Sequence, residues 1–344
     1  MDLVQKKDTI LDYPDISLPA AGEAREIVPG VRWVRMPLPM ALDHVNLWLL
    51  ADGDQWAAVD TGISTEAIKG MWESVLGTHP LSHLVVTHMH PDHLGLAHWL
   101  QEKTGAPLWM TLGEYTVAQL FLAQMGNWSF REVEALYARH GLSEELQQAL
   151  ASRGSSYAKG VPSIPATFRR MVDGDMITIG DHEWKVITGT GHSPEHASLY
   201  CADLGILVSG DMMLPRISTN VGVSPTGPED DGLGRFLDSI ARFRDLPEDT
   251  LVLPAHGRPF CGLHLRIAQL EAHHAERCEL LAEACVEPKT AAELIPVLFD
   301  RPINDAHQIF FALGEAIAHL NHLQRYGRLQ RVDDGTTIRF ITVA

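Results

Sequence analysis

The stretch Thr87-His88-Met89-His90-Pro91-Asp92-His93 follows the apolar run Leu84-Val85-Val86 and organises the rest of the chain. It places three imidazoles and a carboxylate within six positions, which is more than packing requires. Imidazole is the commonest side-chain metal ligand, and ligands crowded on one tight turn can reach metal ions without further chain folding. His88 and His90 alternate as strand residues do, whereas Asp92 and His93 fall on the turn that opens the next helix. The stretch therefore predicts a metal site with two clusters, His88 with His90 and Asp92 with His93.

Length, composition and charge describe a globular chain of about two domains. The 344 residues are 45% hydrophobic, which is enough to bury a sizeable core. The 27 basic and 44 acidic residues give a net charge of −17, which repels nucleic-acid phosphates. The first eight residues lack the apolar segment of a secretory signal, and no stretch has the ~18 uninterrupted apolar residues of a membrane span, so neither feature is expected. The four cysteines form no Cys-x-x-Cys pair, which argues against a disulfide framework. We expect a cytoplasmic protein that contacts neither membrane nor nucleic acid.

The hydrophobic pattern predicts a β-rich catalytic domain over residues 25–261 with a helical insertion at about 112–170. Residues 1–24 show no clear periodicity and are expected to form an arm on the surface. Expected strands are 27–28, 31–36, 45–50, 56–59, 107–110, 176–179, 184–187, 198–201, 206–209 and 251–253. Expected helices are 64–76, capped by Ser64 or Thr65, then 94–103, 114–125, 131–140, 143–152 and 233–244.

Histidine or aspartate residues follow the ends of several expected strands. These are His88 after 84–86, His192 after 184–187, Asp211 after 206–209 and His256 after 251–253. Four strand ends that meet at one sheet edge would form a site. Asp60 ends the strand 56–59 at the same edge, where it could orient a ligand imidazole or serve only as a turn residue.

These residues resemble the motifs of the metallo-β-lactamase superfamily of metallo-hydrolases over about residues 25–260. The matching segments are Thr87–His93, Gly191-His192-Ser193-Pro194-Glu195-His196, Ser209-Gly210-Asp211 and Pro254-Ala255-His256-Gly257. The resemblance implies an α/β fold, an αβ/βα sandwich with the metals at one edge between two sheets. It implies one metal held by His88, His90 and His192, and another held by Asp92, His93 and His256. Asp211 would bridge both metals. The lactam-cleaving branch has a cysteine at that position, so the chain looks like the glyoxalase II, lactonase and nuclease-like branches.

Such a site implies two divalent metal ions, with zinc expected and iron or manganese as alternatives. Two metals can share a bridging hydroxide, lower its pKa to near 7 and polarise the carbonyl that it attacks. No Gly-x-Ser-x-Gly elbow is present to compete for this role. We expect a hydrolase acting on an ester or thioester, with Asp92 orienting the hydroxide and carrying a proton to the leaving group. His196 is expected behind the ligands, with a plain structural histidine as the alternative.

Substrate contacts are expected from two regions. Arg216 and Asn220 follow Asp211 and must pass close to the metals, where Arg216 could bind a substrate carboxylate or phosphate, or pair with a nearby acid. Tyr115 lies in the helical insertion, which could cover an apolar pocket as a lid or simply pack against its neighbours. The expected partner is a small-molecule acyl substrate.

The C-terminal segment, residues 262–344, is expected to form a domain of its own. Helices are expected at 264–284, 291–299 and 305–326, followed by strands at 329–332 and 337–343. This order resembles the winged-helix extension on one branch of the superfamily. The segment holds eight Lys/Arg against eleven Asp/Glu, the wrong sign for binding phosphates. Packing, or assembly of a homodimer, is the expected role.

Three other functions stay open at this level. A nuclease or phosphodiesterase acting on RNA fits the winged-helix resemblance but not the acidic charge. A lactonase or lactam hydrolase is disfavoured because Met212, Met213 and Leu214 stand where homoserine lactonases carry a tyrosine. A non-catalytic metal-binding regulatory protein is disfavoured because every ligand position is filled.

Overall fold

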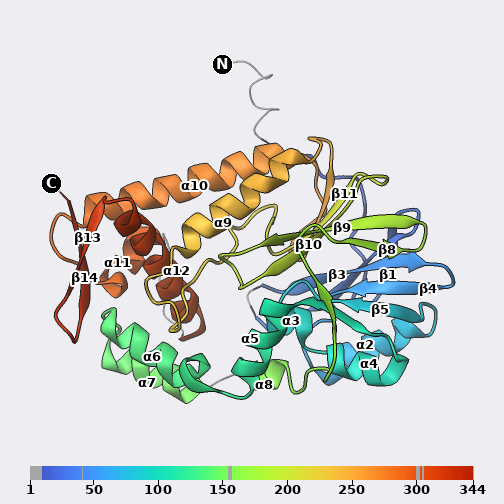
Figure 1. The fold of residues 1–344 in the computed structure, drawn as a ribbon, viewed down its shortest axis with the longest axis horizontal. Coiled ribbons are helices and arrows are strands. Elements are labelled where there is room, and N and C mark those ends of the chain that lie inside the picture. Colours follow the sequence, from blue (N-terminus) through green and yellow to red (C-terminus); the bar gives the residue numbers. More distant parts are fainter. Residues whose placement is uncertain (1–9, 41, 154–156, 300–302, 304–305, 344) are drawn as a thin grey trace.

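Two β-sheets pack face to face between two layers of helices in this protein (Figure 1). The computed structural model describes residues 10–40, 42–153, 157–299, 303 and 306–343. The expected αβ/βα sandwich is confirmed by this layering. Among the described residues, no helix is long and apolar enough to cross a membrane.

The first sheet has seven strands, ordered β1 to β7 across the sheet. Antiparallel pairing joins β1 through β4, and parallel pairing joins β4 through β7. The strands are β1 (Ala24–Val28), β2 (Val31–Pro37), β3 (His44–Asp52), β4 (Gln55–Val59), β5 (Leu81–Val85), β6 (Leu108–Thr111) and β7 (Arg169–Met171). β7 begins one residue before the expected end of the helical insertion, because its main chain pairs with β6.

The second sheet has five strands in the order β12-β11-β10-β9-β8. Only β11 and β12 are parallel neighbours, and the other pairs are antiparallel. The strands are β8 (Met176–Ile179), β9 (His182–Gly189), β10 (His196–Cys201), β11 (Ile206–Gly210) and β12 (Leu251–Pro254). Because β9 and β11 are both antiparallel to β10, the carboxyl ends of β9, β11 and β12 share one edge.

Helices α2, α3, α4 and α5 cover the outer face of the first sheet. They are α2 (Glu66–Leu76), α3 (Pro91–Leu94), α4 (Ala97–Thr104) and α5 (Leu112–Leu122). Thr65 caps α2 by accepting the Ile68 N–H. The helix expected over 94–103 is present as α4, but it begins three residues later than expected, because Leu94 belongs to α3 and a break separates the two helices. The break arises because the Leu96 N–H donates to the Thr61 hydroxyl instead of to a helical carbonyl.

The rest of the insertion continues with η1 (Gly126–Trp128), α6 (Phe130–Arg139), α7 (Glu144–Arg153) and α8 (Tyr157–Gly160). α6 and α7 do not pack on the sheets; they share an apolar core with the C-terminal helices (Figure 1). The Tyr137 hydroxyl donates to the Phe310 carbonyl, and the Ala292 N–H donates to the His140 carbonyl. The insertion therefore reaches from the first sheet to the C-terminal segment.

The second sheet is covered by α9 (Gly232–Ala241), which continues as η2 (Arg242–Asp245), and by α10 (Leu263–Ala284). The C-terminal segment adds α11 (Ala291–Leu298), α12 (Ala306–Arg325) and the hairpin of β13 (Leu329–Asp333) and β14 (Ile338–Thr342). Thr290 and Glu293 form a capping box at α11. The helix start expected at residue 305, and residues 1–9 of the expected arm, lie outside the described residues. Residues 11–16 of the arm lie against residues 258–261.

Asn46 on β3 joins the two sheets at the edge where the strands end. Its side chain is fully buried, donates to the Pro254 and Gly257 carbonyls, and accepts the indole N–H of Trp33. Its main-chain N–H donates to the Ala255 carbonyl. One amide thus satisfies three buried groups from both sheets.

Asn46→Ala should lower the free energy of unfolding by about 2–4 kcal/mol, because two carbonyls and an indole N–H would be left buried without partners. Chemical denaturation followed by fluorescence measures this change. Asn127→Ala removes the same side chain from an exposed position and should leave stability unchanged. Equal stability of the two variants would contradict the role given to Asn46.

Candidate metal centre

The strands described above bring seven histidine and aspartate side chains to one edge of the sandwich. β5 leads to the segment that carries His88, His90, Asp92 and His93, and β9, β11 and β12 lead to His192, Asp211 and His256. Three overlapping groups form there, each with its ligand atoms within 4.8 Å of one another. They are His88 with His90 and His192; His88 with His93 and Asp211; and Asp92 with His93 and His256.

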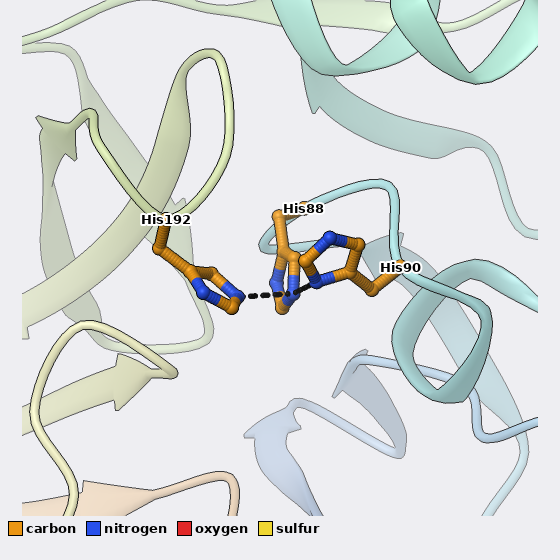
Figure 2. Close-up of side chains that lie close together, drawn as sticks. All are labelled: His88, His90 and His192. Atoms are coloured by element: carbon orange, nitrogen blue, oxygen red, sulfur yellow. Dashed lines mark hydrogen bonds between the residues drawn. The ribbon is translucent and has the colours of Figure 1, made fainter. Parts of the chain in front are cut away.

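The first cluster consists of three histidines (Figure 2). The His88 Nε2 lies 2.9 Å from the His90 Nδ1 and 3.2 Å from the His192 Nε2. The His192 Nδ1–H donates to the Asn220 carbonyl at 2.7 Å, so the His192 Nε2 carries a lone pair when the ring is neutral. The Thr87 hydroxyl donates to Asp60 and accepts the His88 Nδ1–H, so the His88 Nε2 is also bare. Two lone pairs therefore face each other at 3.2 Å.

The second cluster mixes imidazoles with a carboxylate. The Asp92 Oδ2 lies 3.5 Å from both the His93 Nε2 and the His256 Nε2. The His93 Nδ1–H donates to Asp60, and the His256 Nδ1–H donates to the His44 carbonyl. Both rings therefore turn an Nε2 toward the cluster, and the buried His93 Nε2 has no hydrogen-bond partner among the described residues.

Asp211 lies between the two clusters. Its Oδ2 is 3.4 Å from the His192 Nε2, and its Oδ1 is 3.3 Å from the His256 Nε2 and 3.6 Å from the His93 Nε2. One carboxylate thus presents one oxygen to each cluster. This is the arrangement that a bridging ligand needs.

Burial and local charge prepare the two clusters differently. Burial lowers the pKa of His88 and of His192, and it lowers the pKa of His90 to about 3, so these rings are neutral and their lone pairs are available. Burial has the same tendency at His93, but Asp92, Asp60 and Asp211 outweigh it and raise the pKa of His93 to about 10. The carboxylates therefore create a field that favours positive charge beside the His93 Nε2.

This donor set fits divalent metal ions. Facing lone pairs and an orphaned buried Nε2 are unfavourable by themselves and become favourable when a cation shares them. Four of the rings also have the oxygen partner behind them that fixes the orientation of metal-binding imidazoles. The assignment of the seven residues as ligands stays a prediction, and the geometry brings all of them together.

Asp60 supports both the His88 and the His93 rings. Its carboxylate accepts the Thr87 main-chain N–H, the Thr87 hydroxyl and the His93 Nδ1–H. The residue is buried and adopts a left-handed φ of 65°, which is uncommon outside glycine and marks a held conformation. Of the two readings of Asp60, orientation of ligand imidazoles is the one that this geometry favours.

His196 lies directly behind Asp211. It is fully buried, and its Nε2 accepts the Asp211 main-chain N–H at 3.1 Å. Gly210 permits this contact, since its φ is 52° and a Cβ there would overlap the His196 ring. His196 therefore fixes the main chain that carries the Asp211 carboxylate.

The three expected substrate contacts have different surroundings. Arg216 is exposed and forms no ion pair with any described residue. The Asn220 carbonyl accepts a hydrogen bond from the His192 Nδ1–H, while the Asn220 side chain is hydrogen-bonded to the Glu315 carboxyl group. Tyr115 donates its hydroxyl to the Pro165 carbonyl and stacks on Phe168 at 4.0 Å, inside the insertion. Contact of these side chains with substrate stays a prediction.

Sequence patterns did not reveal two further residues at the site. The His44 carbonyl accepts a hydrogen bond from the His256 Nδ1–H, and the His44 Nε2 accepts one from the Gly257 N–H. Glu114, in the first turn of α5, is buried and bonds both loops of the three-histidine cluster. Burial raises the pKa of Glu114 to about 7, although the hydrogen bonds that it accepts act to lower it. The one available signal was its position on the helix that follows β6 at the same sheet edge.

Fold and site together define a metallo-hydrolase. The chain belongs to the metallo-beta-lactamase superfamily, whose family model matches residues 40–256. A second family model, described as the metallo-beta-lactamase-like C-terminal domain, matches residues 278–343.

Several known proteins are similar to the chain, two of those named here over most of its length. A beta-lactamase domain protein from Burkholderia ambifaria has a crystal structure with 47% sequence identity and a TM-score of 0.90, covering 97% of this chain and 98% of that one. A probable metallo-hydrolase of Bacillus subtilis (strain 168) is 25% identical over 90% of this chain and 97% of its own length. A hydroxyacylglutathione hydrolase of Rhodospirillum rubrum is 30% identical over 35% of this chain and 44% of its own length.

Asp60→Asn should reduce the affinity for zinc by about 10–100-fold, because the amide cannot accept from all the donors that now fix His93 and Thr87. Asparagine tolerates the left-handed φ, so the main chain should persist. Chelator competition on reloaded protein measures the affinity. The control is Asp54→Asn, which removes the same charge from the exposed turn after β3. The orientation role would be wrong if both variants bound zinc equally well.

Proposed function

We propose that this protein is a dinuclear metal-dependent hydrolase that cleaves an ester or thioester of a small acyl substrate. The observation that carries the proposal is the position of Asp211, one carboxylate facing two clusters of buried, pre-oriented imidazoles. One cluster would consist of His88, His90 and His192, and the other of Asp92, His93 and His256, with Asp211 shared. Zinc is the proposed metal.

Divalent cations held there would lower the pKa of water toward 7 and polarise a carbonyl oxygen, so no side-chain nucleophile is needed. The chain's own residues supply position and proton transfer. Asp60, the Asn220 carbonyl and the His44 carbonyl fix the rings, and His196 fixes Asp211. The polar groups are thereby organised before substrate arrives.

Asp92 is the proposed proton carrier. Its carboxylate lies 3.5 Å from the His93 and His256 rings, and its side chain keeps 19% of its surface exposed, whereas the His93 ring is fully buried. A carboxylate at the solvent side of the cluster can accept a proton from the attacking water and pass it to the leaving group.

The acyl class is supported by two features. Asp211 fills the bridging position, as the resemblance to glyoxalase II-like enzymes implies, and part of the chain is similar to a hydroxyacylglutathione hydrolase, whose substrate contains a thioester. The net charge of −17 opposes an RNA substrate. We place the acyl group beside the insertion, where Leu112 at the start of α5 is 42% exposed.

Asp211→Ala should lower kcat/KM for thioesters by more than about 100-fold, since loss of a residue that only orients a ligand already costs about 10–100-fold. The measurement is turnover of a panel of acyl thioesters, simple esters, lactones and single-stranded RNA by the wild type and this variant. Removal of metal with a chelator should abolish turnover, and restoration by zinc, iron or manganese identifies the effective metal. Turnover of RNA alone would move the function to the nucleases.

Arg216→Ala should raise KM about tenfold with little change in kcat on an acyl substrate that carries a carboxylate, because one charge-assisted hydrogen bond made equally in ground and transition states is lost. Steady-state kinetics separate the two constants. Arg170→Ala removes an exposed arginine elsewhere and should leave KM unchanged. Unchanged constants in both variants would remove Arg216 from the binding site.

A further inference from the structure

Glu114 is a buried carboxylate that the proposed reaction does not use. It lies in the first turn of α5, directly after β6, and none of its surface reaches solvent. A buried carboxylate is costly unless its oxygens are satisfied, so its partners indicate why it is there.

Both oxygens of Glu114 accept hydrogen bonds from the loops of the three-histidine cluster. The Oε2 accepts the main-chain N–H of Met89, the residue between His88 and His90, at 2.9 Å. The Oε1 accepts the Ser193 hydroxyl at 2.6 Å and the Glu195 N–H at 2.7 Å, just after His192. One side chain therefore joins two loops that are far apart in the sequence.

The junction of β6 and α5 docks on the His192 loop at further points. The Thr111 hydroxyl donates to the Glu195 carbonyl, and the Gly113 N–H donates to the Glu195 carboxylate, both at 2.7 Å. A Cβ at Gly113 would lie 2.9 Å from the Glu195 Cβ, so the two segments are in close contact. Glu114 is thus held firmly relative to the loop that it bonds.

The insertion also holds the other side of the Met89 residue. The Tyr157 hydroxyl on α8 donates to the Met89 carbonyl at 2.8 Å. Both main-chain polar groups of Met89 are therefore bound by side chains of the insertion, and His88 and His90 flank this fixed point.

We propose that Glu114 is a positioning residue that ties the His88–His90 loop to the His192 loop and so sets the geometry of the three-histidine metal cluster. This inference rests on the metal centre of the proposed function but not on its substrate. It gives the insertion a role in metal binding in addition to any role as a lid.

Glu114→Gln tests the inference with little change of shape. The amide offers one oxygen in place of two, and its NH₂ group faces an N–H donor whichever way it is turned. We expect one of two zinc-binding events to weaken by about 10–100-fold, the range seen for residues that support metal ligands, while the other is unchanged. Zinc titration of metal-free protein against a chromophoric chelator resolves both events.

Two further variants make the result specific. Glu145→Gln removes the same charge from an exposed position on α7 and should bind zinc as the wild type does. His90→Ala should eliminate the event that belongs to the three-histidine cluster. Adding Glu114→Gln to His90→Ala should then change nothing further, which a general loss of stability would not produce.

Each outcome decides the question. If the wild type binds no zinc, the metal centre and the proposed function both fail. If the wild type binds two zinc ions and Glu114→Gln binds both as tightly, only the role of Glu114 is overturned. If Glu114→Gln does not fold, Ser193→Ala removes one donor to the carboxylate. It should weaken the same event by about fivefold, the effect of one hydrogen bond, and unchanged affinity would overturn the inference.

Discussion

Two imidazole nitrogens that carry no hydrogen face each other where the sheets meet, and this contact constrains the rest of the molecule. His88 and His192 are 104 residues apart in the chain, yet their Nε2 atoms lie 3.2 Å from each other. Two acceptors do not approach so closely without support. The Thr87 hydroxyl and the Asn220 carbonyl fix the rings from behind, and the strand ends bring these oxygens into place.

The sequence alone could predict the part of the site that consists of rare residue types in short segments. The residues His88 to His93 stand out because packing does not explain three histidines on one turn. The apolar runs before His192, Asp211 and His256 predict three strands. The directions of these strands in the sheet then place the three residues at the same edge. The capping box at Thr290 is equally local, since its two side chains are three residues apart.

The residues that hold the ligands in place could not be predicted in the same way, because their partners are distant in sequence. His44 meets His256 across 212 residues, and Glu114 meets Ser193 across 79. Locally, Glu114 resembles any acidic residue in the first turn of a helix, where the helix dipole favours it. The helices of the insertion could likewise be predicted from its sequence pattern. The pattern does not predict that some of these helices pack on the first sheet and others on the C-terminal helices.

Because the insertion packs partly on the first sheet and partly on the C-terminal helices, it cannot be fully packed until late in synthesis of the chain. α6 packs its aromatic side chains Phe130 and Tyr137 against Phe310 of α12, and the Tyr137 hydroxyl donates to the Phe310 carbonyl 173 residues later. The ribosome produces all seven proposed ligands before α12 exists. The α6–α7 part of the insertion therefore reaches its final packing only after α12 has emerged, so the nascent chain holds all seven proposed ligands before the insertion is complete.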